Sequence, residues 1–381
     1  MNNSTSTEAP QRFKEYFEGK DYQKSLRRRH GSERRFRFFG LSAIAVSLLL
    51  LLILMVTVTG AGYTAFEQTF VKLKITLDPE RVPADDLRSA DFLGLIKDSM
   101  REMFPDVSGR SEKRNLFALV SPSAGFELFE MVEEDPSLIG ESIEVWLPTD
   151  DDVDQYFKGN LDMSGPVEQH RLNENQVAWL DQLENDGRIE KQFNWTLFQA
   201  GDSREPESSG ILGALMGSFY TLIVTLVLSF PIGVAAAVYL EEFAPTNKIT
   251  DFIEVNINNL AAVPSIVFGL LGLAVFLNFF GLPRSAPLVG GLVLTLMTLP
   301  TIIISSRAAI KAVPPSIREG ALAVGSSKMQ ATIFHVLPLA LPGILTGSII
   351  GMAQALGETA PLLMIGMVAF IVDIPGSITD P

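Results

Sequence analysis

The stretch that decides the fold is residues 314–338, PPSIREGALAVGSSKMQATIFHVLP, a polar loop between long apolar segments. Within it, Glu319-Gly320-Ala321 precedes Gly325, and Leu337-Pro338 closes the loop. A chain that is mostly membrane helix has little reason to keep such a loop unless the loop docks onto something in the cytoplasm. We therefore predict a membrane protein in which this loop contacts a cytoplasmic partner.

The loop contains the signals of a short helix. Ser316-Ile317-Arg318-Glu319 fits a capping box, in which a Ser hydroxyl and a Glu carboxylate satisfy free N–H groups at a helix start. Gly325 is a predicted left-handed stop, and the small residues Gly320 and Ala321 keep the helix slim enough for a groove. From these residues alone, an amphipathic connector on the membrane surface fits as well as a docking helix.

Five apolar segments are long enough to cross a bilayer core, which takes about 20 residues. They are 41–60, 211–240, 258–280, 286–306 and 336–356, and the last is continued by residues 361–372. A retained first span fits better than a cleaved signal peptide, because the polar leader of about 40 residues is too long for one.

Two separate basic clusters agree on one orientation. Six arginines lie between residues 27 and 37, and the loop 307–335 contains Arg307, Lys311, Arg318 and Lys328. The excess of Lys and Arg in cytoplasmic segments places both clusters inside. We therefore expect a basic cytoplasmic tail at 1–40, a first transmembrane helix at 41–61 and an external block at 62–210.

The external block is acidic and has the pattern of a small α+β domain. Residues 71–210 hold 14 Lys and Arg against 30 Asp and Glu, which disfavours nucleic acid as a partner. Residues 71–77 and 143–147 are typical of strands, residues 87–103 of a helix, and residues 201–210 of a flexible exit.

No cofactor or metal site is expected in the chain. Asp150, Asp152 and Asp154 have calcium-loop spacing, but Gln155 and Leu161 replace the Gly and Glu that such a loop needs. An acidic turn is the better interpretation. The chain has no Cys, and its three His residues form no metal-binding or hydrolase pattern.

Several segments together resemble the permeases of ABC importers. Glu319-Gly320-Ala321, Gly325 and Leu337-Pro338 are similar to the EAA loop of that family, although Gly320 and His335 depart from its usual residues. YLEEFAP at 239–245, VPSIVFGL at 263–270 and GETAPLL at 357–363 resemble the phosphate-specific importer and, within it, the PstA-type permease. The resemblance covers roughly residues 211–372.

The resemblance implies an all-α polytopic membrane bundle, a MetI-like ABC importer permease, with an inserted α+β soluble domain. The permease domain would occupy 211–381, with a coupling helix at about 315–330, and we expect it to be truncated before a last span. Implied partners are ATPase subunits that bind ATP and Mg, a second permease of PstC type and an extracytoplasmic phosphate-binding protein, at a bacterial inner membrane. The sequence has no Walker A pattern, so this chain is expected to be no enzyme and to bind no nucleotide itself.

Glu358 is the predicted centre of the substrate path. A carboxylate in a membrane span costs about 2.5–3.5 kcal/mol, so it usually faces a cavity or a partner, although an interfacial position is the alternative. The family typically has a cation one turn earlier, where this chain has Gln354. A cationic partner would then come from the companion permease, while Thr359 and Ser265 offer hydroxyl groups.

Two other functions stay open. The missing cation leaves room for another oxyanion, such as molybdate or sulfate. A membrane-anchored sensor, in which the acidic domain reads a ligand, would need no ATPase.

Overall fold

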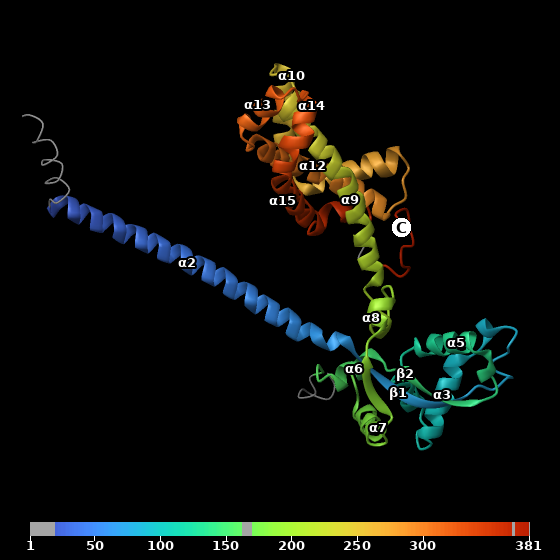
Figure 1. The fold of residues 1–381 in the computed structure, drawn as a ribbon. Coiled ribbons are helices and arrows are strands. Elements are labelled where there is room, and N and C mark those ends of the chain that lie inside the picture. The colour runs from blue at the N-terminus through green and yellow to red at the C-terminus, as the bar shows by residue number, and fades with distance from the viewer. Residues whose placement is uncertain (1–19, 162–169, 368–369, 381) are drawn as a thin grey trace, which may run out of the picture. The chain divides into compact units, whose positions relative to one another are not determined.

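The computed structural model describes residues 20–161, 170–367 and 370–380, in two compact units, Met1–Glu67 and Gln68–Pro381 (Figure 1). The first unit consists of the helix α2 (Lys20–Gly62) and the turn η1 (Tyr63–Phe66). The helix therefore includes most of the basic segment as well as the apolar run, because Lys, Arg, Gln and Glu are good helix formers. Residues 1–19 of the predicted tail lie outside the described residues.

The second unit begins with the predicted α+β domain. Its three strands form one sheet in the order β2-β1-β3: β1 (Glu67–Thr76), β2 (Ser142–Pro148) and β3 (Ile189–Phe193). Strands β1 and β2 are antiparallel, with Ile75 opposite Ile143. The helices are α3 (Phe92–Met103), α4 (Arg110–Phe117), α5 (Ala124–Glu134), α6 (Asp151–Phe157), α7 (Glu174–Asn185) and α8 (Thr196–Gln199).

The alternating pattern of β1 reflects a sheet with one buried face. Val71, Leu73, Ile75 and Leu77 are each at most 1% exposed and belong to one core with residues of α3, α5 and α7. Successive side chains of a strand point to opposite faces, so every second residue enters this core. The two predicted strands and the α+β character of the domain are confirmed.

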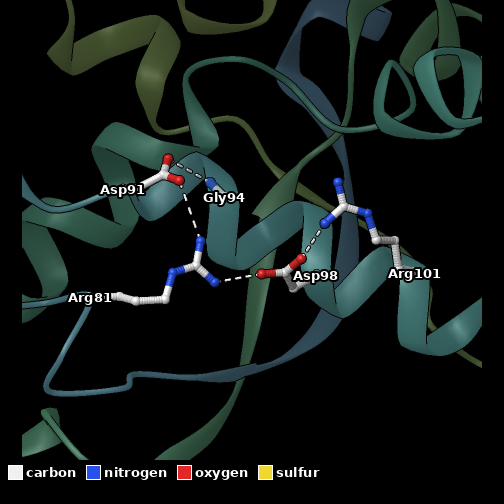
Figure 2. Close-up of polar contacts among 5 residues, drawn as sticks. All are labelled: Arg81, Asp91, Gly94, Asp98 and Arg101. Atoms are coloured by element: carbon white, nitrogen blue, oxygen red, sulfur yellow. Dashed lines mark hydrogen bonds and ion pairs between the residues drawn. The ribbon is translucent and has the colours of Figure 1, made fainter. Parts of the chain in front are cut away.

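The helix predicted at 87–103 begins later than expected because Asp91 caps it. The Asp91 carboxylate accepts a hydrogen bond from the Gly94 N–H at 2.9 Å, and α3 starts at Phe92. The guanidinium of Arg81 joins Asp91 to Asp98, which also pairs with Arg101 (Figure 2). The hydrogen bond from Arg81 holds the pKa of Asp98 below its usual value. This arrangement fixes the loop before α3 to the side of the helix.

The three aspartates with calcium-loop spacing each serve a different partner within the protein. Asp150 accepts a hydrogen bond from the Asp152 N–H and so caps α6. Asp154 is buried, pairs with Lys158 and accepts a hydrogen bond from the Thr69 N–H at 2.8 Å. These contacts engage Asp150 and Asp154 within the protein, as the interpretation as an acidic turn expects.

The segment 201–210 is packed, which differs from the expected flexible exit. Glu207 is 7% exposed and accepts a hydrogen bond from the Ser121 hydroxyl. Its backbone carbonyl accepts another from the Gln68 side chain at 2.8 Å. The Ser, Glu and Pro content suggested flexibility, but the Glu207 carboxyl holds the segment to Ser121 and the Glu207 carbonyl holds it to the start of β1.

The remainder of the second unit is a helical bundle. Its elements are α9 (Leu212–Val238) with the π-helical turn η6 (Tyr239–Phe243), α10 (Lys248–Ala261), α11 (Ser265–Gly272) with the π-helical η7 (Leu273–Phe279), α12 (Pro287–Lys311), α13 (Pro315–Ala323), α14 (Lys328–Ala331) with the π-helical η8 (Thr332–Val336), α15 (Leu337–Leu356) and α16 (Ala360–Met364). Including α2, the described residues contain 4 helices long and apolar enough to cross a membrane, or up to 5 if one bent pair is a single span.

Helices α9 and α12 run in the same direction with their backbones close together. A Cβ at Gly291 would lie 2.5 Å from Val224, and one at Gly233 would lie 2.7 Å from Ile302. Residue 224 thus lies beside residue 291 and residue 233 beside residue 302, so the residue numbers rise in the same direction along both helices. Both helices would cross a membrane in the same sense, as the predicted order of crossings requires.

Helix α15 runs the opposite way along α12 and uses its glycines at the contact. A Cβ at Gly347 would lie 2.1 Å from the Ser305 hydroxyl, and one at Gly343 would lie 2.8 Å from Ala309. Glycine at intervals of four residues lets helix backbones approach closely in lipid. The close contact of α15 with α12 is therefore made through these glycines.

Two apolar segments are less regular than expected. The segment 258–280 is no single straight span, because α10 and the helix from Ser265 to Phe279 meet at an angle of 100°. Pro264 disfavours helical backbone at the residue before it, which explains the break. In the last segment α15 ends at Leu356, and the chain turns again at Gly366, where φ is +91°.

Candidate functional site

The predicted docking loop forms α13, a helix of 9 residues at one end of the bundle near α10 and α14 (Figure 1). The expected capping box at Ser316 and Glu319 is wrong. Pro315 occupies the first helical position and its fixed φ suits a helix start, so Ser316 lies inside the helix. The capping box of this loop is instead Ser327 with Gln330, which starts α14.

The end of α13 agrees with the prediction for Gly325. This residue has a φ of +89°, a conformation that glycine adopts without strain. The Gly325 N–H donates to the Leu322 carbonyl at 3.0 Å, and the Ser326 N–H donates to the Ala321 carbonyl at 3.1 Å. These bonds satisfy carbonyls that the end of a helix leaves unpaired.

One face of α13 is buried and the other is open. Ala321 is 6% exposed, whereas Glu319 and Gly320 are exposed and nothing lies within 4 Å of a Cβ placed at Gly320. Leu322 is 48% exposed and Val324 is 82% exposed. The helix therefore presents a slim surface of one carboxylate, small residues and apolar side chains.

Arg318 fixes the buried face of α13 to two other helices. Its guanidinium donates to the Glu242 carboxylate at 2.8 Å, to the Val313 carbonyl at 2.7 Å and to the Ile310 carbonyl at 2.8 Å. Glu242 lies in the π-helical turn η6 that follows α9; the Ile310 carbonyl lies in the last turn of α12 and the Val313 carbonyl just after it. A cation there satisfies the last carbonyls of α12 and interacts favourably with its dipole.

A second arginine ties three further elements together beside the first. Arg307 of α12 donates to Glu241 of η6 at 2.7 Å and pairs with Glu254 of α10 at 2.7 Å. All three side chains are partly buried. The ends of α9 and α12 and the middle of α10 therefore meet in one charged cluster next to α13.

The π-helical turn η6 supplies two of the three carboxylates of this cluster, Glu241 and Glu242. The Ala244 N–H donates to the Tyr239 carbonyl at 2.8 Å, the bond of a helix widened by one residue. Consecutive Glu241 and Glu242 thereby serve two arginines from different parts of the chain. Sequence reasoning quoted this segment only as part of a resemblance and missed its role, as it missed Glu254.

The predicted substrate-path residues cluster at the other end of α15. Gln354 is exposed in the last turn of α15, Glu358 is half-buried in the break after it, and Thr359 precedes α16. Glu358 forms no ion pair within the part of the chain that the structure describes. Thr359 lines a mostly apolar cavity of about 300 Å³ between α9, α12 and α16, together with Thr221.

Ser265 lies on the helix that packs against this break. A Cβ at Gly269 of α11 would lie 2.7 Å from Pro361, and one at Gly272 would lie 3.2 Å from Ile365. Helices α11 and α16 therefore run in the same direction, and Ser265 lies one turn before the glycine that approaches Pro361. Gln354, Glu358 and Thr359 lie together where α15 ends, and the role of all four residues in substrate passage stays a prediction.

Comparison with known proteins identifies the bundle. Residues 229–375 match the family model described as binding-protein-dependent transport system inner membrane component. The chain is 36% identical over 173 residues to a probable ABC transporter permease protein, YqgI, of Bacillus subtilis, which covers 45% of this chain and 58% of the relative. It is 34% identical over 173 residues to the phosphate transport system permease protein PstA of Mycobacterium leprae, covering 45% of this chain and 56% of the relative.

The N-terminal part of the chain, with α2 and most of the α+β domain, has its own match. Residues 23–167 match a domain of unknown function, DUF3333. One solved structure, of the inward-facing MetNI methionine ABC transporter, is 23% identical with a TM-score of 0.37 and covers 41% of this chain and 75% of that one. Because that score is low, the fold assignment rests on the family match and on the helices themselves.

The chain spans somewhat more than half the length of the curated relatives it matches. Its residues 229–375 match an inner-membrane transport permease family and are similar to PstA-named relatives, and the chain is a multi-pass membrane protein with an added α+β domain. The relatives are transport components, which agrees with the expectation that the chain is no enzyme.

Proposed function

We propose that this chain, whose residues 229–375 are the permease domain, is the transmembrane subunit of an ATP-driven phosphate importer. It would form the anion path with a second permease of PstC type and receive phosphate from an extracytoplasmic binding protein. Two ATPase subunits with their ATP and Mg would supply the energy. The N-terminus would be cytoplasmic and residues 62–210 periplasmic.

The observation that carries this proposal is the attachment of α13. An exposed short helix with a slim surface is suited to a groove on a partner, and Arg318 connects it to the ends of α9 and α12. A displacement of α13 would therefore act on two membrane helices at once. Switching between two arrangements of packed helices is a common form of transport and allosteric change.

The substrate path would run past the break between α15 and α16. Gln354, Thr359 and Ser265 offer an amide and two hydroxyls, which can donate hydrogen bonds to phosphate oxygens. The carboxylate of Glu358 would accept a hydrogen bond from protonated phosphate or pair with a cation of the second permease. PstA-named relatives favour phosphate over another oxyanion.

The test measures uptake and ATP hydrolysis in cells that express the chain with its partner subunits. Glu319→Arg should abolish phosphate uptake and substrate-stimulated ATP hydrolysis at normal membrane levels, because it reverses the charge on the open face of α13. Asp251→Arg is a matched control, an exposed acidic residue of α10 at the same end of the bundle. Unchanged ATP hydrolysis in Glu319→Arg would contradict the proposal and favour a sensor, and competition by molybdate rather than phosphate would change the substrate.

A further inference from the structure

An exposed aromatic cluster lies at the exit of the α+β domain. Phe193, Trp195 and Phe198 are 48%, 64% and 40% exposed, respectively. The rings of Phe193 and Trp195 meet edge to face with centroids 4.8 Å apart, and Phe193 is stacked with Phe198 at 6.0 Å. Large aromatic groups that gather on a surface usually mark a place where the protein meets a partner or a membrane.

The backbone of this cluster is joined directly to the first membrane helix of the permease domain. The Ile211 N–H donates to the Leu197 carbonyl at 2.8 Å, and the Leu212 N–H donates to the Ala200 carbonyl at 3.1 Å. Gly210 and Gly201 are also hydrogen-bonded, at 2.7 Å. The short helix α8 therefore lies against the start of α9, and the aromatic residues cannot move far from it.

An apolar stripe on α9 extends to Ile211, the residue that is hydrogen-bonded to α8 beside the cluster. Ile211, Leu215, Phe219 and Ile223 are spaced by four residues and are 47%, 59%, 53% and 40% exposed. Residues four apart lie on one face of a helix, and an apolar face of this kind suits lipid. The lipid-facing surface of α9 therefore continues to the residue that is hydrogen-bonded to α8.

The length of α9 agrees with a position of the aromatic cluster at the membrane surface. From Ile211 to Glu241 the helix rises roughly 45 Å at 1.5 Å per residue. A bilayer with its headgroup regions measures about 40–45 Å. If the charged cluster at Glu241 and Arg307 lies in the inner headgroup region, Ile211 and the aromatic cluster lie in the outer one, where Trp and other amphipathic rings concentrate.

We infer that Phe193, Trp195 and Phe198 form a membrane anchor, which inserts into the headgroup region of the outer phospholipid leaflet and holds the exit of the α+β domain at the membrane surface. The occupant of this surface is lipid, because the cluster continues a lipid-facing stripe. The anchor does not depend on the substrate or on the ATPase partners.

The absence of Cys from the chain allows a clean test by single spin labels. Trp195→Cys and the control Phe126→Cys are labelled in the full chain, reconstituted in vesicles of phosphatidylethanolamine and phosphatidylglycerol. Phe126 is a matched control because it is 62% exposed but lies on α5, away from the cluster in sequence. Collisions with a water-soluble nickel complex and with oxygen then report the depth of each label.

The label at 195 should collide severalfold less with the nickel complex than the label at 126 and should respond to oxygen dissolved in lipid. Equal access of nickel to both labels would overturn the inference. Shielding that requires other subunits would assign the surface to a protein contact and would also overturn it. A second measurement avoids the cysteine change: in a variant with Trp146 and Trp179 replaced by Phe, brominated phospholipids should quench Trp195 fluorescence, and a lack of quenching would contradict the anchor.

Discussion

Replacement of Arg318 should release α13 from the bundle. The guanidinium of Arg318 donates to three acceptors, the Glu242 carboxylate and the carbonyls of Ile310 and Val313. In Arg318→Gln, Glu242 would stay 8% exposed with no cation beside it, and the two carbonyls would lose their donor. Arg318→Lys keeps the charge but replaces the planar fork by a single ammonium group, which cannot reproduce the three directions.

The size of the effect follows from these contacts. A hydrogen bond to a charged group contributes about 1.5–3 kcal/mol, and breaking a buried ion pair by removal of one partner costs about 3–5 kcal/mol. Arg318 is 24% exposed on its side chain, so the lower end applies. We expect Arg318→Gln to lower the free energy of local opening of α13 by about 3 kcal/mol, a roughly 100-fold rise in the open population, and Arg318→Lys to have a smaller effect.

Hydrogen–deuterium exchange read by mass spectrometry measures this opening directly in the full chain in lipid nanodiscs. Exchange in residues 314–326 should accelerate in Arg318→Gln, whereas Lys311→Gln, which changes an exposed lysine of the same region, should leave it unaltered. The double variant with Glu242→Gln should be less affected than the sum of the single changes, because it leaves no unpaired carboxylate. Unchanged exchange in both single variants would refute the assigned role of the pair.

Three further outcomes are expected. Burial, together with the nearby Glu130, raises the pKa of Glu127 from 4.5 to about 7. Because the folded domain then binds the proton more tightly than the unfolded chain, the free energy of unfolding falls as the pH rises from 4.5 towards 7. Glu127→Gln should therefore raise the melting temperature at pH 8 but not at pH 5. Gly347→Val should lower the unfolding temperature by disrupting the contact with Ser305, an overpacking cost of about 1–3 kcal/mol, while Gly320→Ala should not; equal melting curves would contradict the packing. Glu358→Gln should abolish or uncouple phosphate uptake although the protein still inserts, and wild-type uptake would remove the proposed role of Glu358.

The regular parts of the fold were predictable from local patterns. The alternation from Val71 to Leu77 identified a strand because one face of the sheet is buried. The two wrong predictions, the cap at Ser316 and the single span 258–280, arise where a proline overrides another local signal. Pro315 sets the start of α13 and displaces Ser316 from the cap, while Pro264 breaks a segment whose composition suggested one span.

The charged cluster beside α13 could be predicted only in part. Arg318 and Gly325 were recognised from the loop itself. Their counterparts lie far away in the sequence: Glu242 precedes Arg318 by 76 residues, and Glu241 precedes Arg307 by 66 residues. Acidic residues at the end of one apolar segment and basic residues at the same end of another are a usable signal, but the pairing depends on which helices lie together.

The way Arg318 divides its hydrogen bonds has a mechanical consequence. The parallel helices α9 and α12, which pack closely at Gly233 and Gly291, are both hydrogen-bonded near their ends to the Arg318 side chain. A force on α13 would act on α9 and α12 together and would not make one slide along the other. The two helices would then tilt as one rigid body, and the contact that changes would be the one between α12 and the glycines of α15.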